Sequence, residues 1–243
     1  MTKLAIASFA DKAYNPFGKR IFNWYRDAGK TDHNNPAVNV GFFVSCRQGR
    51  TFFCEVLMKL KAKIMDEAAL NRALMRISHE IAERNRGAEN LLLIGIRRRG
   101  EPIARRICDN IAAIEGIQVP CASIDTGIFR DDLTAGHDNR ETRRLSLPFD
   151  VNDKDLILVD DVLYTGRTVR AAIEAVFTCG RPRTSQLAVL VDRGHRELPI
   201  RADYVGKNIP TSRMELVKVR LPEYDEETGV FLFENNVPEI KIK

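Results

Sequence analysis

The spacing of hydrophobic positions changes near residue 57. From Met58 onward, short apolar runs alternate with segments in which apolar residues recur every three or four positions. This alternation is typical of β-α units around a mostly parallel sheet. Residues 11–57 are instead rich in Asn, Gly, Lys and aromatic side chains and show no steady period. The pattern predicts an α/β domain over residues 58–243, with a boundary near residue 57.

The first helix-period segment follows Asp66, a good N-cap, and continues to about Asn85, with Gly87 beyond it as a stop signal. At 100° per residue, its apolar side chains share one face and its charged side chains lie on the opposite face. The expected core face holds Leu70, Leu74, Ile77 and Ile81, and the expected basic outer face holds Arg72, Arg76, His79 and Glu83.

Further β-α units follow this helix. Buried strands are expected at residues 91–95, 119–124, 156–159 and 187–191, and helices are expected from Glu101 onward and over residues 168–179. The polar stretch 125–144 predicts a mobile hairpin or lid. The order of these elements favours a central, mainly parallel sheet flanked by helices.

Composition limits the classes of protein that fit. Hydrophobic residues make up 44% of the chain and charged residues 29%, and no apolar run approaches the roughly 20 residues of a membrane span. The cysteines are odd in number and form no C-x-x-C pair, so we expect neither structural disulfides nor a zinc site. They are Cys46, Cys54, Cys108, Cys121 and Cys179. This usage suits a reducing, cytoplasmic location and no membrane partner.

The net charge of +5 is concentrated at one end of the chain. Residues 1–57 carry a balance of +4, which leaves only +1 for residues 58–243. Bulk charge therefore says little about nucleic-acid binding, and any RNA site must come from local clustering.

The strongest chemical signal is residues 156–168, LILVDDVLYTGRT. Four apolar residues predict a buried strand, Asp160 and Asp161 stand at its carboxyl end, and a Thr-Gly-Arg-Thr turn opens the next helix. Ligands bind at that edge of open α/β sheets. Backbone N–H groups at a helix start, with Thr hydroxyls and a Gly, can hold a phosphate.

The adjacent acids fit a sugar ligand. Asp160 and Asp161 can accept hydrogen bonds from ribose hydroxyls, and their charge favours an anomeric carbon that becomes positive as a leaving group departs. Two acids that merely cap a strand and a helix would explain either residue alone, but they would not explain the whole thirteen-residue segment.

Residues 156–168 resemble the ribose-phosphate signature of the type I phosphoribosyltransferases. Residues 191–204 (VDRGHRELPIRADY), continuing through 206–211 (GKNIPT), resemble the family of bifunctional pyrimidine operon attenuators and uracil phosphoribosyltransferases. The resemblance extends from about Met58 to about Asn235. It implies a type I phosphoribosyltransferase fold with a small hood built from the lid and C-terminal segments.

The resemblance also implies a reaction and a set of residues. Uracil would displace pyrophosphate from 5-phosphoribosyl-1-pyrophosphate (PRPP), giving UMP, with Mg²⁺ bound through the pyrophosphate of the substrate and no dedicated protein metal site. Residues 95–100 match the pyrophosphate loop, in which Arg98 stands where relatives often carry Thr. The implied catalytic residues are Asp160, Asp161 and Arg99. The implied substrate-binding residues are these three with Arg98, Val162, Leu163, Tyr164, Thr165, Gly166, Arg167, Thr168, Arg193 and, through its backbone at the uracil ring, Val217.

A second implied partner is the leader mRNA of the pyrimidine operon. The family binds this RNA through a basic surface, and the matching residues here are Arg76, His79, Arg84, Arg196, Arg201 and Lys207. Such groups can contact phosphates and unstacked bases in an RNA loop. Met75 replaces a Thr that is usual in relatives. The alternative for each residue alone is a solvated polar face.

The expected function is therefore UMP- or UTP-dependent binding of leader RNA, which attenuates transcription, combined with uracil phosphoribosyltransferase activity in a homodimer or higher homo-oligomer. One rival is a salvage enzyme without a regulatory role. Another is an RNA regulator with negligible catalysis.

Residues 1–57 do not match the family. Residues 58–66 resemble an ordinary start, a short first strand leading into the first helix, so the favoured hypothesis is that translation begins at Met58. Peptides from before Met58 in the endogenous protein would reject it. The alternative is a genuine basic appendage with Phe22, Trp24 and Tyr25 that aids RNA or subunit contact.

Overall fold

The computed structural model describes residues 37–45, 51–126 and 147–235, in two compact units. The larger unit comprises Met65–Pro210 and Val219–Gly229. The smaller unit comprises Met1–Ile64, Thr211–Lys218 and Val230–Lys243. Nearly all of the predicted lid at 125–144 lies outside the described residues.

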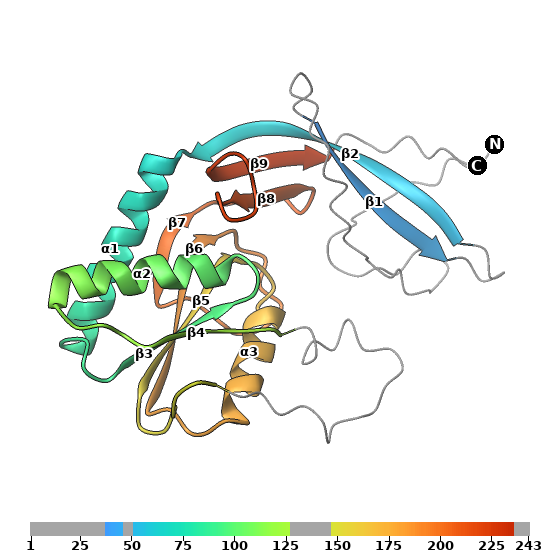
Figure 1. The fold of residues 1–243 in the computed structure, drawn as a ribbon. Helices are drawn as coiled ribbons and strands as arrows, with labels where there is room; N and C mark the ends of the chain where they lie inside the picture. The colour runs from blue at the N-terminus through green and yellow to red at the C-terminus, as the bar shows by residue number, and fades with distance from the viewer. Residues whose placement is uncertain (1–36, 46–50, 127–146, 236–243) are drawn as a thin grey trace, which may run out of the picture. The chain divides into compact units, whose positions relative to one another are not determined.

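The larger unit contains a five-stranded sheet in the order β4-β3-β5-β6-β7, in which every neighbouring pair is parallel (Figure 1). The strands predicted at residues 91–95, 156–159 and 187–191 are all present and lie at its centre. The bounds are β3 Leu91–Ile96, β4 Cys121–Ile124, β5 Asp155–Leu163, β6 Thr184–Asp192 and β7 Tyr204–Asn208. This confirms the mainly parallel sheet.

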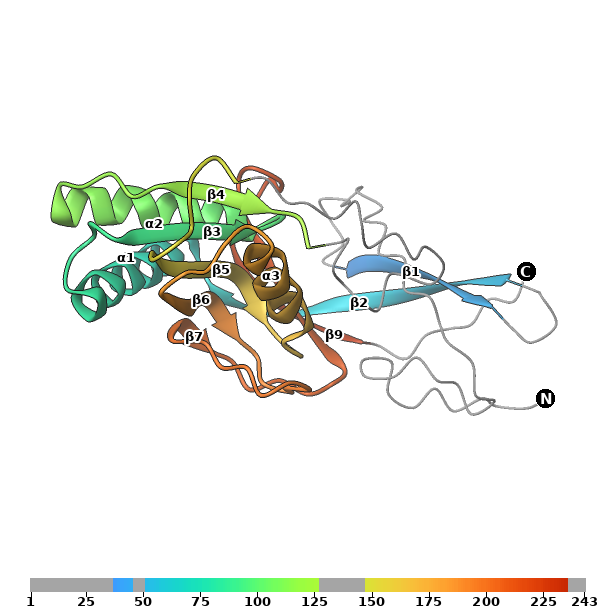
Figure 2. The same cartoon turned by 90° about the horizontal axis from the view of Figure 1, so that it is seen from below.

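Three helices pack on this sheet: α1 (Glu67–Asn85), α2 (Gly100–Glu115) and α3 (Arg167–Phe177). Helix α2 connects β3 to β4, whereas α3 connects β5 to β6 in the opposite direction along the sheet. Because such crossovers are right-handed, the two helices cover opposite faces. Helix α1 packs beside α2 (Figure 2).

Both faces of the sheet are covered, which explains why its central strands are continuously apolar. Leu92, Ile94 and Ile96 alternate along β3 and share one core cluster with Val169 and Ala172 of α3. Leu91 and Leu93, which point to the other face, are equally buried. The apolar runs read from the sequence are therefore strands buried on two sides.

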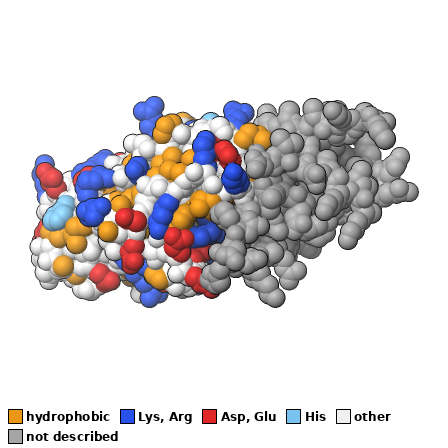
Figure 3. Space-filling model, turned by 90° about the horizontal axis from the view of Figure 1, so that it is seen from above, with side chains coloured by type: hydrophobic (Ala, Val, Ile, Leu, Met, Phe, Trp, Pro, Cys, Tyr) orange, Lys and Arg blue, Asp and Glu red, His pale blue; other side chains and the backbone are white. Residues whose placement is uncertain are grey.

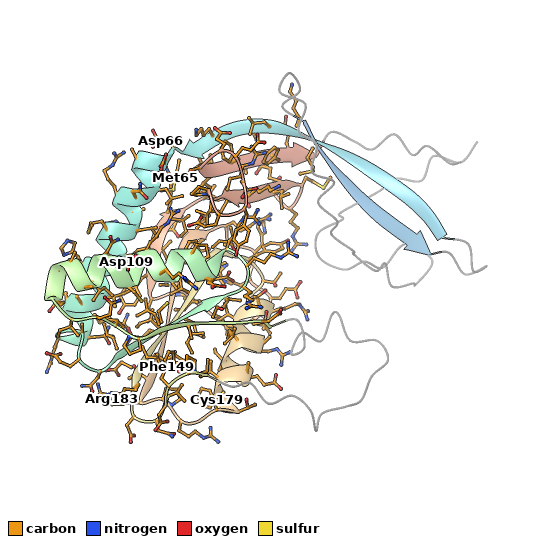
Figure 4. The ribbon with its side chains drawn as sticks, viewed as in Figure 1. Met65, Asp66, Asp109, Phe149, Cys179 and Arg183 are labelled. Atoms are coloured by element: carbon orange, nitrogen blue, oxygen red, sulfur yellow. The ribbon has the colours of Figure 1, made fainter. Side chains whose placement is uncertain are left out.

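Helix α1 matches the sequence prediction closely. Asp66, labelled in Figure 4 at the start of the helix, accepts a hydrogen bond from the Ala69 N–H at 2.7 Å. This is the N-cap geometry that satisfies one of the unpaired donors of the first turn. The four predicted core residues are buried and the four predicted outer residues are exposed. None of the described helices is long and apolar enough to cross a membrane.

The smaller unit is a four-stranded sheet in the order β1-β2-β9-β8. Its bounds are β1 Ala37–Ser45, β2 Thr51–Met65, β8 Glu215–Arg220 and β9 Gly229–Asn235. Met58 packs with Phe231 and Phe233 in its apolar cluster. The first strand, expected to be short, is a 15-residue strand because β1 pairs with it antiparallel over Thr51–Lys59. That residues 1–57 are an addition to the domain stays a prediction.

Candidate functional site

The order of the strands creates an opening at the carboxyl ends of β3 and β5. The chain leaves β3 toward one edge of the sheet and leaves β5 toward the other edge. Ligands bind at such a switch point in open α/β sheets. The arginine loop, residues 97–99, follows β3, and the acidic turn, residues 160–168, spans the end of β5 and the start of α3. The topology therefore brings the two strongest sequence motifs together.

Two glycines allow close backbone contacts where the arginine loop enters α2. A Cβ added to Gly100 would lie 2.4 Å from the carbonyl oxygen of Val159, and one added to Gly95 would lie 2.6 Å from the Gly100 carbonyl oxygen. Only a residue without a side chain fits these backbone contacts. Gly100 thus sets the distance between the arginine loop and Asp160, the next residue of β5.

Asp160 and Asp161 differ in their surroundings. Asp160 is buried, and its Oδ1 accepts a hydrogen bond from the Asp161 N–H at 2.9 Å. As a whole residue, Asp161 is half-buried, but protein atoms surround its carboxyl group. Burial of this carboxyl raises its pKa, and the positive charge of Arg99 opposes that shift. The charge of Arg99, from the other motif, therefore acts on Asp161.

The second half of the acidic turn forms the predicted strand-turn-helix junction. Gly166 has a φ of +91°, a left-handed conformation that favours glycine, and α3 begins at the next residue. The N-cap Gly166 has no side chain to cap the helix, and the Thr165 hydroxyl accepts a long hydrogen bond from the Arg167 N–H at 3.4 Å. The first N–H groups of a helix have no partner within the helix and carry its positive dipole end, so this junction can hold a phosphate.

A neighbouring loop, residues 193–200, makes hydrogen bonds to the backbone of the acidic turn. The N–H groups of Glu197 and Leu198 donate to the Thr165 carbonyl oxygen at 3.0 and 3.1 Å. Arg196 donates from Nη1 to the Leu163 and Tyr164 carbonyl oxygens at 3.3 and 2.8 Å. The Arg196 guanidinium thus connects this loop to the backbone of the acidic turn.

Arg193 and Tyr164 form a stacked pair at the same place. The Arg193 guanidinium lies 4.1 Å from the centroid of the Tyr164 ring, and Arg193 is only 5% exposed. The His195 ring meets Tyr164 edge-on, with 6.1 Å between centroids. A buried cation on an aromatic face is held firmly, so Arg193 supplies a fixed positive charge next to the turn.

The residues proposed for RNA contact divide into two groups. Arg76, His79 and Arg84 lie on α1, Lys207 lies on β7, and Arg201 shortly precedes β7; all five are exposed. Helix α1 packs on β7, so Arg76, His79, Arg84 and Lys207 share one region, here called the α1–β7 surface. Arg196 instead contacts the backbone of the acidic turn.

Two arginines of the α1–β7 surface are held in place by the protein. Arg76 donates from Nη2 to the carbonyl oxygens of Val205 and Gly206, both at 2.8 Å. Arg84 pairs with Asp203 at 2.9 Å and lies over the Tyr204 ring. Figure 3 shows one face of the molecule from above, and on that face Lys and Arg side chains are interspersed with acidic and apolar groups.

Val217 lies on β8 and is buried in the smaller unit. Its predicted backbone contact with a uracil ring stays a prediction.

Sequence reasoning missed two acids that hold site arginines. Asp225 binds Arg99, with 3.0 Å between Oδ2 and Nη2, and Glu197 accepts a hydrogen bond from Arg167 Nε at 2.7 Å. Glu197 lies inside a segment already singled out as informative. Asp225 lies among Glu223, Glu226 and Glu227, and such an acidic run has the pattern of a solvated loop.

Comparison with known proteins gives consistent results. A family model described as phosphoribosyl transferase domain matches residues 62–224. "Bifunctional protein PyrR" of Clostridium kluyveri is 58% identical over 177 residues, which cover 73% of this chain and 99% of that protein. The proteins of the same name from Clostridioides difficile and Oceanobacillus iheyensis are 59% and 56% identical, over 72% and 73% of this chain and 98% and 99% of theirs.

Solved structures show the same fold at low sequence identity. A hypoxanthine phosphoribosyltransferase from Trypanosoma cruzi has a TM-score of 0.56 at 18% identity and covers 73% of this chain and 98% of its own. One from Staphylococcus aureus has a TM-score of 0.53 at 18% identity, covering 73% of this chain and 93% of its own.

Proposed function

The chain belongs to the phosphoribosyltransferase family and, within that family, to the bifunctional PyrR proteins. We propose that it makes UMP from uracil and that it regulates pyrimidine operon transcripts. The resemblance read from the sequence and the type I phosphoribosyltransferase fold are both confirmed. The observation that carries the proposal is the packing of the arginine loop on β5 at the point where Asp160 and Asp161 begin the acidic turn.

In the proposed reaction, N1 of uracil forms a bond to C1′ of PRPP. The bond from C1′ to the pyrophosphate oxygen breaks, pyrophosphate leaves with that electron pair, and the N1 proton is released. Asp160 and Asp161 hold the ribose hydroxyls, and their negative charge stabilises the positive C1′ in the transition state. The start of α3 holds the 5′-phosphate, because its first N–H groups point into the turn. Arg98 and Arg99 bind the leaving pyrophosphate.

Magnesium fits this site as part of the substrate. The described residues contain no group of three His, Cys, Asp or Glu side chains that could hold a metal by themselves. Mg²⁺ commonly takes one or two carboxylates, several waters and substrate phosphates, so a site with two acids beside a pyrophosphate loop suits it. Asp160 and Asp161 would supply those carboxylates, directly or through water. When bound, Mg²⁺ would neutralise negative charge on the pyrophosphate.

The regulatory half of the proposal rests on the α1–β7 surface. His79 and Lys207 present exposed donors there. Arg76 and Arg84 are held by their contacts but keep 49% and 54% of their side chains exposed. Arginines held in one geometry lose less freedom on binding. We assign this surface to the leader RNA. UMP or UTP in the nucleotide site favours RNA binding to the extent that it binds the RNA-competent state more tightly.

Binding of a labelled transcript of this organism's pyrimidine operon leader, with and without UMP, tests the regulatory function. We expect His79→Ala/Lys207→Ala to weaken binding about tenfold or more, because each lost contact to RNA costs roughly 1 kcal/mol. Uracil turnover by the same variant is expected to stay normal. Arg105→Ala is the matched control, because Arg105 is an exposed arginine of α2, 70% accessible and outside the α1–β7 surface.

The rival salvage enzyme predicts a different outcome. If the wild-type protein binds no leader RNA at near-physiological salt while uracil turnover is intact, the regulatory half is rejected. If RNA binds in a UMP-dependent way without measurable UMP formation, the enzymatic half is rejected.

Arg196→Ala is expected to impair both functions. Its guanidinium holds the Leu163 and Tyr164 carbonyl oxygens, so its loss loosens the acidic turn. We expect KM for PRPP to rise roughly tenfold, since charge-assisted hydrogen bonds are about twice as strong as neutral ones. Steady-state kinetics of Arg196→Ala beside Arg201→Ala checks this. An Arg196→Ala enzyme with normal kinetics and lost RNA binding would instead assign Arg196 to RNA alone.

The remaining assignments follow from the same proposal. The protein acts in the cytoplasm, where its RNA and PRPP are found, and it forms homodimers or higher homo-oligomers that extend the basic surface across two subunits. Val217 contacts the uracil ring through its backbone.

A further inference from the structure

The arginine loop is held by a segment far away in the sequence, residues 221–227, which lies between β8 and β9. Within the larger unit, Arg99 donates from Nη2 to both carboxylate oxygens of Asp225, at 3.2 and 3.0 Å. Tyr224 donates from its hydroxyl to the Arg98 carbonyl oxygen at 3.4 Å. Arg106 of α2 pairs with Glu223 at 2.9 Å. Three successive residues of this segment therefore contact the arginine loop and helix α2.

Asp225 is itself held rigidly. Its Oδ2 accepts a hydrogen bond from the Leu221 N–H at 3.1 Å, and its own N–H donates to the Leu221 carbonyl oxygen at 2.8 Å. The side chains of Asp225 and Arg99 are only 13% and 22% exposed. A largely buried, charge-assisted pair with one partner fixed by its own turn determines where the other partner lies.

One donor of Arg99 is left without a partner in this position. Its Nε is shielded from solvent and has no hydrogen-bond partner among the described residues. A buried donor without a partner is costly, and such groups in native proteins call for an explanation. The ion pair with Asp225 supplies one, because it fixes the guanidinium of Arg99, whose neighbour Gly100 packs against the backbone of Val159 and Asp160 at the start of the acidic turn.

We propose that Asp225 is a positioning residue that orients Arg99 for the pyrophosphate group, and that it thereby sets the affinity for PRPP and for pyrophosphate. The inference rests on the proposed phosphoribosyl transfer. If Asp225 acted only through its charge, it would neutralise Arg99 and weaken anion binding. Its removal would then strengthen the binding of PRPP and pyrophosphate, whereas loss of a positioning residue weakens it. The sign of the effect therefore separates the two roles.

Asp225→Asn is the direct test, because an Asn oxygen can still accept the Leu221 N–H while the charge that holds Arg99 is lost. We expect KM for PRPP and the inhibition constant of pyrophosphate to rise together by about tenfold, and KM for uracil to change less than about twofold. Glu223→Gln is the matched control, because it removes the Arg106 pair from the same segment and leaves Arg99 in place. It should leave all three constants near wild type.

Asp225→Asn with unchanged or tighter PRPP and pyrophosphate binding overturns the proposal, as does an equal loss in Glu223→Gln, which would indicate general loosening of the segment. Calorimetric binding of PRPP to Arg99→Ala and to Arg99→Ala/Asp225→Asn gives a second check that does not need turnover. If Asp225 acts through Arg99, the second substitution changes the affinity no further; a further tenfold loss contradicts that route.

These binding data also separate the two levels of inference. A wild-type protein that binds PRPP but forms no UMP defeats the proposed enzyme and still allows Asp225 to be judged by affinity. A wild-type protein that does not bind PRPP overturns both.

Discussion

UMP formation by Asp160→Asn is expected to fall about 100-fold or more in kcat/KM, the size typical for loss of one preorganised electrostatic group at a developing charge. Asp160 is buried at the end of β5 and accepts the Asp161 N–H. Asn keeps the shape and can keep that hydrogen bond, so the change removes mainly the negative charge that stabilises C1′. Steady-state kinetics with uracil and PRPP measures the effect.

Asp153→Asn is the control for this experiment. Asp153 is exposed just before β5, at the opposite end of that strand, and its φ of +57° is tolerated by Asn. It should retain normal turnover. If Asp160→Asn also retains normal turnover, the paired acids only terminate a strand and the proposed chemistry fails.

Gly100→Ala is expected to damage both activity and stability. Its new Cβ would lie 2.4 Å from the Val159 carbonyl oxygen, a backbone atom of a central strand, so the arginine loop must move away from β5. Overpacking of this kind costs roughly 1–3 kcal/mol of unfolding free energy. Displacement of a catalytic group by about 1 Å can cost roughly 100-fold in rate. Chemical denaturation and UMP kinetics on the same sample measure the two effects.

Gly180→Ala separates local displacement from a general cost of replacing glycine. Its Cβ would meet Asn152 Oδ1 and Val151 Cγ2 at 2.8 Å, which are side-chain atoms and not the backbone of a central strand. We expect a smaller loss of stability and normal turnover. A Gly100→Ala enzyme with wild-type kinetics would show that the close contact between loop and strand does not position Arg99.

Helix α1 shows how far local patterns reach. The N-cap, the apolar face and the stop signal lie within about 20 residues of sequence, and each acts through backbone geometry or helix periodicity. The prediction of the helix and of its basic outer face was accordingly confirmed. The pattern did not reveal that this outer face makes contacts within the protein. Arg76 donates hydrogen bonds to Val205 and Gly206, which are 129 and 130 positions away in the sequence.

The strand β2 shows the opposite limit. Residues 51–57 had no clear period, and their strand depends on pairing with β1, which is a contact between segments. Strand propensity is weak without its partner, since cross-strand packing provides most of the preference. The sequence therefore predicted a strand only from residue 58 onward.

By itself, the sequence determined the parallel sheet and the acidic turn, because buried apolar runs, paired acids and a turn glycine act over a few residues. Only the tertiary structure decided which side chains hold those motifs in place. Arg99 and Asp225 are 126 positions apart, and Arg196 holds carbonyl oxygens 32 and 33 positions away. An ion pair or a side-chain bond to a backbone carbonyl leaves no periodic signal in either segment, so it becomes visible only when the fold brings the two partners together.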